Sequence, residues 1–221
     1  MPHEPTLAHL DPTQLLLHEE VEPARIEQLV AVLAAERRQR EPVLVTPTAH
    51  GMFLLDGAHR TTALRRLGVP RIAALVVPAA EALALTGWTH AVAERGAQAR
   101  LAELADRAAA RPGPVVASIR TTGREAGVHA DDDSPAALMA AFRLVAECYQ
   151  AGPYARLTEP LPPEPDRTEV VWQVPDLATI VTIAATVGVL PAGVTRFRAA
   201  TPAPIVDVGF EELGAPASLS R

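Results

Sequence analysis

The sequence predicts a mixed α/β (α+β) protein. Two short apolar segments, "PVLVTP" and "MFLLD", are separated by "TAHG", whose glycine is typical of a turn between two strands. A helix from about His59 to Leu67 is expected next, with Gly68 as its carboxyl-terminal cap. The apolar segment "RIAALVV" then predicts a further strand, which gives the order β-β-α-β.

The residues before this block predict a strand, a turn and a helix. "LAHLDPTQLL" is interpreted as a short strand and turn, and a helix is expected from about Pro23 to Arg40. Pro23 is tolerated in a first helical turn because the N–H that proline lacks would be unpaired there. One apolar face is indicated by the three- and four-residue spacing of Ile26, Leu29, Val30 and Leu33.

The second half of the chain is less regular. An alanine-rich helix is expected near residues 90–110, a strand at "VVASIR" and a helix from about Pro135 to Gln150. The proline-rich stretch 159–169 is interpreted as a flexible or solvent-exposed connector. "VVWQV" predicts a strand, "PDLATIVTIAATVG" a helix, and "VLPAGVTRFRAATP" a loop-like segment. We expect two domains, 1–90 and a smaller α/β domain at 91–221 that completes a substrate site.

Composition excludes several classes of protein. No run of about eighteen uncharged apolar residues occurs, and the amino terminus lacks a basic, apolar leader, so we expect a cytoplasmic protein without a membrane span. Cys148 is the only cysteine, which excludes a disulfide framework. All 20 basic residues are arginines, scattered in a chain of net charge −6, so no broad nucleic-acid surface is expected. The absence of lysine also removes lysine as a phosphate ligand or base.

The stretch "FLLDGAHRTTALRRLG" (53–68) predicts an anion site. A strand that turns directly into a helix leaves backbone N–H groups at the helix start, with the helix dipole behind them. Gly57 permits a close backbone approach, and Asp56 is placed to hold Mg²⁺ that bridges phosphate oxygens. Further donors follow at His59, Arg60, Thr61 and Thr62.

Each of these residues also has a structural interpretation. Asp56 could cap the helix, His59 could be a hydrogen-bonded core histidine, and Arg60 could form a surface ion pair. Because all three occur together in one strand-to-helix turn, phosphate binding is the better hypothesis.

The same residues carry a resemblance to a known family. "LLDGAHRTTALRRLGVPRIAALVV" resembles the ParB/sulfiredoxin-type fold, and "LHEEVEPARIEQLVAVL" is similar to its free L-serine kinase branch. The resemblance implies an ATP- or ADP-dependent, Mg²⁺-requiring kinase that forms O-phosphoserine, for amino-acid metabolism or a specialised biosynthetic pathway.

The resemblance also implies roles for individual residues. The catalytic base falls on Glu19, with Glu20 as the neighbour that can substitute for it, and Asp56 serves Mg²⁺ and catalysis. The nucleotide phosphates fall on the turn, at Gly57, Ala58, His59, Arg60, Thr61 and Thr62. The amino-acid site falls on Glu20, Trp88, Thr195, Arg196 and Phe197.

Two departures from the family pattern affect the substrate. Ala58 stands where the first of two turn histidines is common, and Phe197 replaces a histidine that helps to hold the substrate. One side of the pocket is therefore expected to be more apolar, and an acceptor other than serine stays open. The position of Ala58 also excludes sulfiredoxin chemistry, which needs a cysteine in the turn.

Two other functional classes would share this turn. A ParB-like DNA-binding protein would need a helix-turn-helix module and a basic surface, neither of which the second half supplies. A catalytically silent nucleotide- or amino-acid-sensing protein stays open as an alternative. The expected partner is a small molecule, with no nucleic acid or membrane, and a homodimer is compatible with the sequence.

Overall fold

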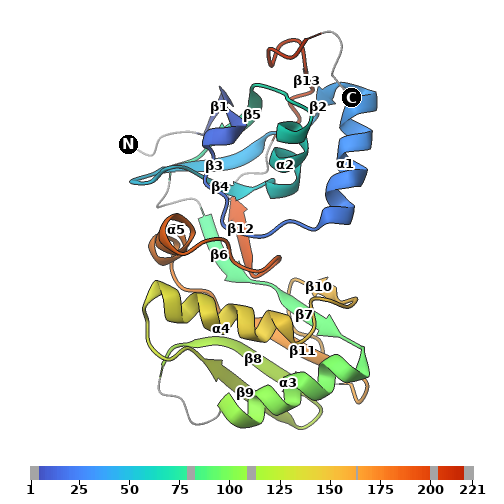
Figure 1. Ribbon diagram of the computed structural model, residues 1–221, viewed down its shortest axis with the longest axis vertical. Coiled ribbons are helices and arrows are strands. Elements are labelled where there is room, and N and C mark those ends of the chain that lie inside the picture. Colours follow the sequence, from blue (N-terminus) through green and yellow to red (C-terminus); the bar gives the residue numbers. More distant parts are fainter. Residues whose placement is uncertain (1–4, 79–82, 109–112, 163, 200–203, 217–221) are drawn as a thin grey trace. The chain divides into compact units, whose positions relative to one another are not determined.

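The protein is described from a computed structural model that covers residues 5–78, 83–108, 113–162, 164–199 and 204–216 (Figure 1). Its chain divides into two compact units, residues 1–84 with 197–221 and residues 85–196. The expected division at residue 90 differs from this one, chiefly because residues 197–221 return to the first unit. They do so because β13 (Val208–Gly209) pairs with β2 (Arg38–Gln39) and Phe210 lies in the first unit's core.

The first unit is built on a four-stranded sheet in the order β1-β5-β3-β4. β3 is parallel to β5, whereas the β1–β5 and β3–β4 pairs are antiparallel. The strands are β1 (Thr6–Leu10), β3 (Val43–Thr48), β4 (Gly51–Asp56) and β5 (Ile72–Val76). The predicted β-β-α-β order is therefore confirmed.

Two helices complete the first unit, together with the short 3-10 helix η1 (Pro12–Gln14). α2 (Ala58–Arg66) lies beside α1 (Pro23–Glu36) in Figure 1, and both contribute to one apolar core with the sheet. The prediction that the first helix extends to Arg40 is wrong. Arg37 adopts a left-handed conformation with φ of 50°, and the chain then pairs as β2.

The second unit has a five-stranded antiparallel sheet in the order β10-β7-β11-β8-β9. Its strands are β7 (Thr89–Val92), β8 (Val115–Thr121), β9 (Arg124–His129), β10 (Ala155–Leu157) and β11 (Thr168–Trp172). Its helices are α3 (Arg95–Ala108), α4 (Pro135–Glu147) and α5 (Leu177–Thr186). The helix expected near 90–110 therefore starts later, because residues 89–92 pair in the sheet.

β6 (Leu83–Gly87) and β12 (Thr195–Ala199) form a separate two-stranded sheet, and each includes a boundary between the units. The prediction that the "VTRFRA" segment is loop-like is wrong, because the pairing partner β6 lies far away in the sequence. β12 carries Thr195, Arg196 and Phe197 of the predicted substrate site, and Trp88 directly follows β6.

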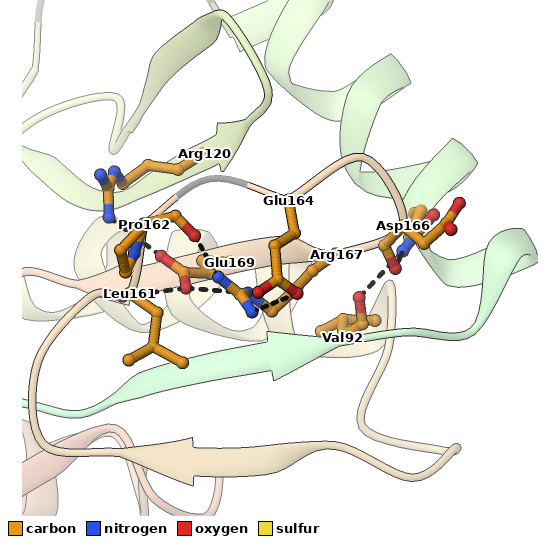
Figure 2. Close-up of polar contacts among 9 residues, drawn as sticks. Val92, Arg120, Leu161, Pro162, Glu164, Asp166, Arg167 and Glu169 are labelled. Atoms are coloured by element: carbon orange, nitrogen blue, oxygen red, sulfur yellow. Dashed lines mark hydrogen bonds and ion pairs between the residues drawn. The ribbon is translucent and has the colours of Figure 1, made fainter.

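The proline-rich stretch 159–169 is only partly a connector. Its last residues enter β11, and the Glu169 side chain is only 4% exposed. This carboxylate accepts hydrogen bonds from Arg120 Nη1 at 2.9 Å, Arg167 Nε at 3.2 Å and the Leu161 N–H at 3.1 Å. Figure 2 shows the cluster around Glu169. Arg167 also contacts Glu164 Oε2 and the Pro162 carbonyl, so the loop is fastened to the sheet.

Candidate active site

The predicted turn lies between the end of β4 and the start of α2. Gly57 has φ of 100°, and an added Cβ would lie 2.6 Å from Val43 Cγ1, so the position requires glycine on two grounds. Gly57 is also the helix N-cap, and no side chain caps α2 there. The hypothesis that Asp56 caps this helix is therefore not supported, and the first-turn N–H groups of α2 keep their anion-binding character.

Arg60 is held by the protein on one side. Its Nη1 donates to the carbonyls of Glu41 at 3.0 Å and Pro42 at 2.9 Å, and its Nη2 donates to Asp56 Oδ2 at 3.2 Å. The Arg60 side chain is 21% exposed, whereas that of Asp56 is 68% exposed. This pairing fixes the guanidinium beside the turn and orients the Asp56 carboxylate.

The two threonines of the turn differ from what the sequence predicted. Thr61 is fully buried, and within the described ranges its hydroxyl has no hydrogen-bond partner. Thr62 Oγ1 donates to the Ala58 carbonyl at 2.8 Å, inside the helix. An anion at this turn would therefore meet mainly backbone N–H groups, His59 and Arg60.

The segment that carries Glu19 runs along β4. Leu16 N donates to the Met52 carbonyl and Leu54 N donates to the Leu16 carbonyl, both at 2.9 Å. Two residues later, His18 Nδ1 lies 2.8 Å from the Leu54 carbonyl. Glu19 is thereby placed near the end of the strand that carries Asp56, and its side chain is 15% exposed. Glu20 is exposed.

His59 joins this segment to the turn. The Glu22 N–H donates to His59 Nε2 at 3.1 Å, so the start of α1 is tied to the start of α2. Since Nε2 accepts, a neutral His59 carries its proton on Nδ1. The ring is partly buried, so the core interpretation of His59 is correct only in part.

His18, the residue before Glu19, is buried, and the sequence predicted no role for it. Its Nε2 lies 3.9 Å from Glu19 Oε1, and the ring stacks on Phe53 with centroids 5.0 Å apart. Burial lowers the pKa of His18, and the negative charges of Glu19 and Asp56 oppose that shift. The negative charges of both candidate catalytic carboxylates therefore favour protonation of this ring, whereas its burial disfavours it.

The second unit brings together Trp88, Thr195 and Arg196. Trp88 N donates to the Val194 carbonyl at 3.2 Å, which sets the tryptophan next to the "GVTR" motif. The Arg196 guanidinium lies over the Trp88 ring at 5.0 Å from its centroid, and Thr195 is buried. Phe197, by contrast, belongs to the first unit, where its ring contacts His18.

A second buried histidine was missed by the sequence reasoning. His90 Nδ1 lies 2.6 Å from the Tyr149 hydroxyl and 3.3 Å from Trp172 Nε1, and its ring stacks on Tyr154. Burial, with a smaller contribution from the charge of Arg156, lowers the pKa of His90 to about 3. The available signal was weak, since a single histidine in "WTHAV" does not reveal a partner 59 residues away.

Neither a metal-binding cluster nor a membrane-spanning helix occurs among the described residues. No group of three or more His, Cys, Asp or Glu side chains is arranged there to hold a metal ion. No helix in those ranges is both long and apolar enough to cross a membrane.

Known proteins match about a third of this chain in sequence. The chain is 34% identical over 77 residues to the ATP-dependent L-serine kinase SbnI of Staphylococcus aureus, which covers 34% of this chain and 30% of SbnI. It is 33% identical over 76 residues to an ATP-dependent L-serine kinase of Staphylothermus marinus, covering 34% of this chain and 29% of that protein. The aligned part thus spans less than a third of either relative. No protein-family model matches the sequence.

Solved structures match nearly the whole chain. SbnI with a C-terminal truncation, from Staphylococcus aureus, superposes with a TM-score of 0.77 at 21% identity, covering 94% of this chain and 88% of that one. A free serine kinase in complex with AMP gives a TM-score of 0.71 at 16% identity, covering 94% and 93%. These likenesses confirm the predicted fold, and with the local sequence identity they confirm the resemblance to the free L-serine kinases.

Proposed function

We propose that this chain is a kinase that transfers a phosphoryl group from ATP or ADP, with Mg²⁺, to the hydroxyl of a free amino acid. L-serine is the proposed acceptor and O-phospho-L-serine the product. The observation that carries this proposal is that the segment bearing Glu19 runs along β4 and is tied by His59 to the turn at Asp56, beside an uncapped helix start. The names of the related proteins, ATP-dependent L-serine kinases, support the same activity over a sensing role.

The turn supplies the phosphate side of the reaction. Backbone N–H groups at the start of α2, with His59 and Arg60, would contact the phosphate oxygens and stabilise the charge that spreads over them during transfer. Mg²⁺ commonly takes one or two carboxylates and completes its shell with phosphate oxygens and water. The single exposed carboxylate of Asp56 fits such a site, where the ion would neutralise phosphate charge.

Glu19 is assigned as the general base. The serine oxygen forms a bond to the terminal phosphorus, the bond from that phosphorus to the leaving nucleotide oxygen breaks, and the hydroxyl proton passes to the Glu19 carboxylate. The low exposure of Glu19 shields the carboxylate from bulk water. Trp88, Thr195 and Arg196 are assigned to the amino-acid substrate, on the family resemblance and their proximity within the second unit.

The activity is tested with the purified protein, Mg²⁺, ATP or ADP, and a panel of free amino acids. Phosphorus NMR should reveal a new phosphomonoester with serine. If nucleotide binds and no amino acid is phosphorylated, the kinase proposal fails and a nucleotide-sensing protein replaces it.

The assigned roles are tested by a matched pair of variants. Glu19→Gln should abolish turnover and leave nucleotide affinity nearly unchanged, because the amide cannot accept the proton. Glu20→Gln, an identical change at the exposed neighbour, should retain turnover. Arg60→Ala should instead weaken nucleotide binding. An equal loss of nucleotide affinity in Glu19→Gln and Arg60→Ala would show that the base is assigned wrongly.

A further inference from the structure

Three rings pack together beside Glu19 in the first unit. His18 packs against Phe53, which stacks on it with an interplanar angle of 29°, and against Phe197, which meets it edge-on at 90° from an adjoining side. The centroid distances from His18 are 5.0 Å and 5.2 Å, and the two phenylalanines are 6.2 Å apart. We refer to Phe53 and Phe197 as the aromatic clamp.

The clamp holds a histidine of defined tautomer. A backbone carbonyl can only accept, so the 2.8 Å contact between His18 Nδ1 and the Leu54 carbonyl means that Nδ1 donates. In the neutral ring Nε2 then carries the lone pair, and it is the nitrogen 3.9 Å from Glu19 Oε1. Burial favours that neutral ring by lowering the pKa of His18, although Glu19 and Asp56 both oppose the shift.

We propose that Phe197 is a positioning residue, which together with Phe53 fixes the His18 ring so that its Nε2 lone pair, and not a proton, faces the carboxylate of Glu19. This inference rests on the proposed function, in which Glu19 accepts the substrate proton. A cationic His18 would form an ion pair with Glu19 and weaken it as a base, whereas a clamped neutral ring leaves the carboxylate basic.

The two sides of the clamp differ in how they are held. Phe53 is fully buried in β4, so it forms a fixed wall. Phe197 is only partly buried and lies on β12, where the chain returns to the first unit. Phe197 is therefore the ring that can be substituted with less damage to the core, and its substitution should change the rate of phosphoryl transfer. We propose this role in place of the expectation that Phe197 sets the choice of amino acid.

The closing experiment compares Phe197→Leu, which removes the ring, with Phe197→Tyr, which keeps it. Phe210→Leu is the matched control, because Phe210 is a buried phenylalanine of the same unit in the apolar core. Each variant is assayed for kcat and for KM of serine, and ¹⁵N-histidine NMR reports the His18 tautomer, with His18→Gln identifying its signals.

Phe197→Leu should lower kcat about tenfold and change KM for serine less than about twofold, with Phe197→Tyr restoring most of the rate. The His18 signals should move from the Nδ1–H form toward a mixture of forms in Phe197→Leu alone. Phe210→Leu should leave both kinetics and His18 signals unchanged below its unfolding temperature.

Two results would overturn the proposal. A rise in KM with kcat unchanged would make Phe197 a substrate contact, and unchanged His18 signals in Phe197→Leu would show that no clamp exists. The NMR measurement needs no catalysis. A wild-type protein that phosphorylates nothing would refute the proposed function, and the His18 signals of Phe197→Leu would still test the clamp.

Discussion

Acidification should destabilise the second unit through His90. The pKa of this histidine falls from 6.5 to about 3 in the folded protein, so the folded ring stays neutral while the unfolded ring takes up a proton below pH 6.5. The unfolded state then binds more protons between pH 6.5 and 3, and stability is lost as the pH falls through that window.

The size of the effect follows from the same two values. Within that window the free energy of unfolding falls by about 1.4 kcal/mol for each pH unit. Since the window begins at pH 6.5, the fall between pH 7 and pH 5 is about 2 kcal/mol. His18, whose pKa is also lowered by burial, adds a loss of the same sign in the first unit. The His90 contribution must therefore be isolated by substitution.

The assay is urea unfolding followed by tryptophan fluorescence at pH 7 and pH 5. Both tryptophans, Trp88 and Trp172, belong to the second unit, so their fluorescence reports that unit. His90→Asn removes the titrating ring and keeps an acceptor for the Tyr149 hydroxyl and Trp172 Nε1. The variant should lose about 2 kcal/mol less than the wild type on moving to pH 5.

Parallel losses in the two proteins would refute this reasoning. They would mean that His90 titrates alike in the folded and unfolded states, so that its burial among aromatic rings does not exclude the proton.

Four further substitutions test the local geometry. Gly57→Ala should cost about 2 kcal/mol, from the positive φ and the contact with Val43, measured by urea unfolding with circular dichroism. Thr61→Val should leave stability within about 1 kcal/mol and nucleotide affinity unchanged; weaker nucleotide binding would show that this hydroxyl meets the phosphate after all. Glu169→Ala should cost about 3 kcal/mol because it removes the buried carboxylate that Arg120 and Arg167 share, whereas Glu164→Ala, at the exposed partner of Arg167, should cost under about 1 kcal/mol. Similar losses of unfolding free energy in the two variants, measured by fluorescence, would mean that burial does not set the strength of these pairs.

Local signals explain what the sequence predicted well. The turn from Asp56 to Arg60 is encoded by adjacent residues, with an apolar strand before it, a glycine at the corner and a helix after it. The first strands and α2 were found for the same reason. The end of α1 was missed because Arg37, a residue that rarely adopts positive φ, stops the helix so that β2 can pair with a distant strand.

Contacts between distant segments explain what was missed. "REAGVH" shows no clear apolar alternation, and β9 is a strand because β8 pairs with it. Glu169 looked like part of a polar connector, yet two arginines make its burial tolerable. Phe197 was assigned to the substrate from its motif, and nothing local to it reveals His18, which lies at the other end of the chain.

The pairing of β2 with β13 bears on how the protein reaches its native state. Arg38 contacts Asp207 across 169 residues, and Phe210 and Leu213 belong to the same apolar core as the first helices. During synthesis the core of the first unit therefore cannot be complete until residues 208–213 have emerged, whereas the second unit, a continuous segment, can fold earlier. The part that carries the proposed base and phosphate turn is thus the last to become complete, so partly made chains are expected to have no activity.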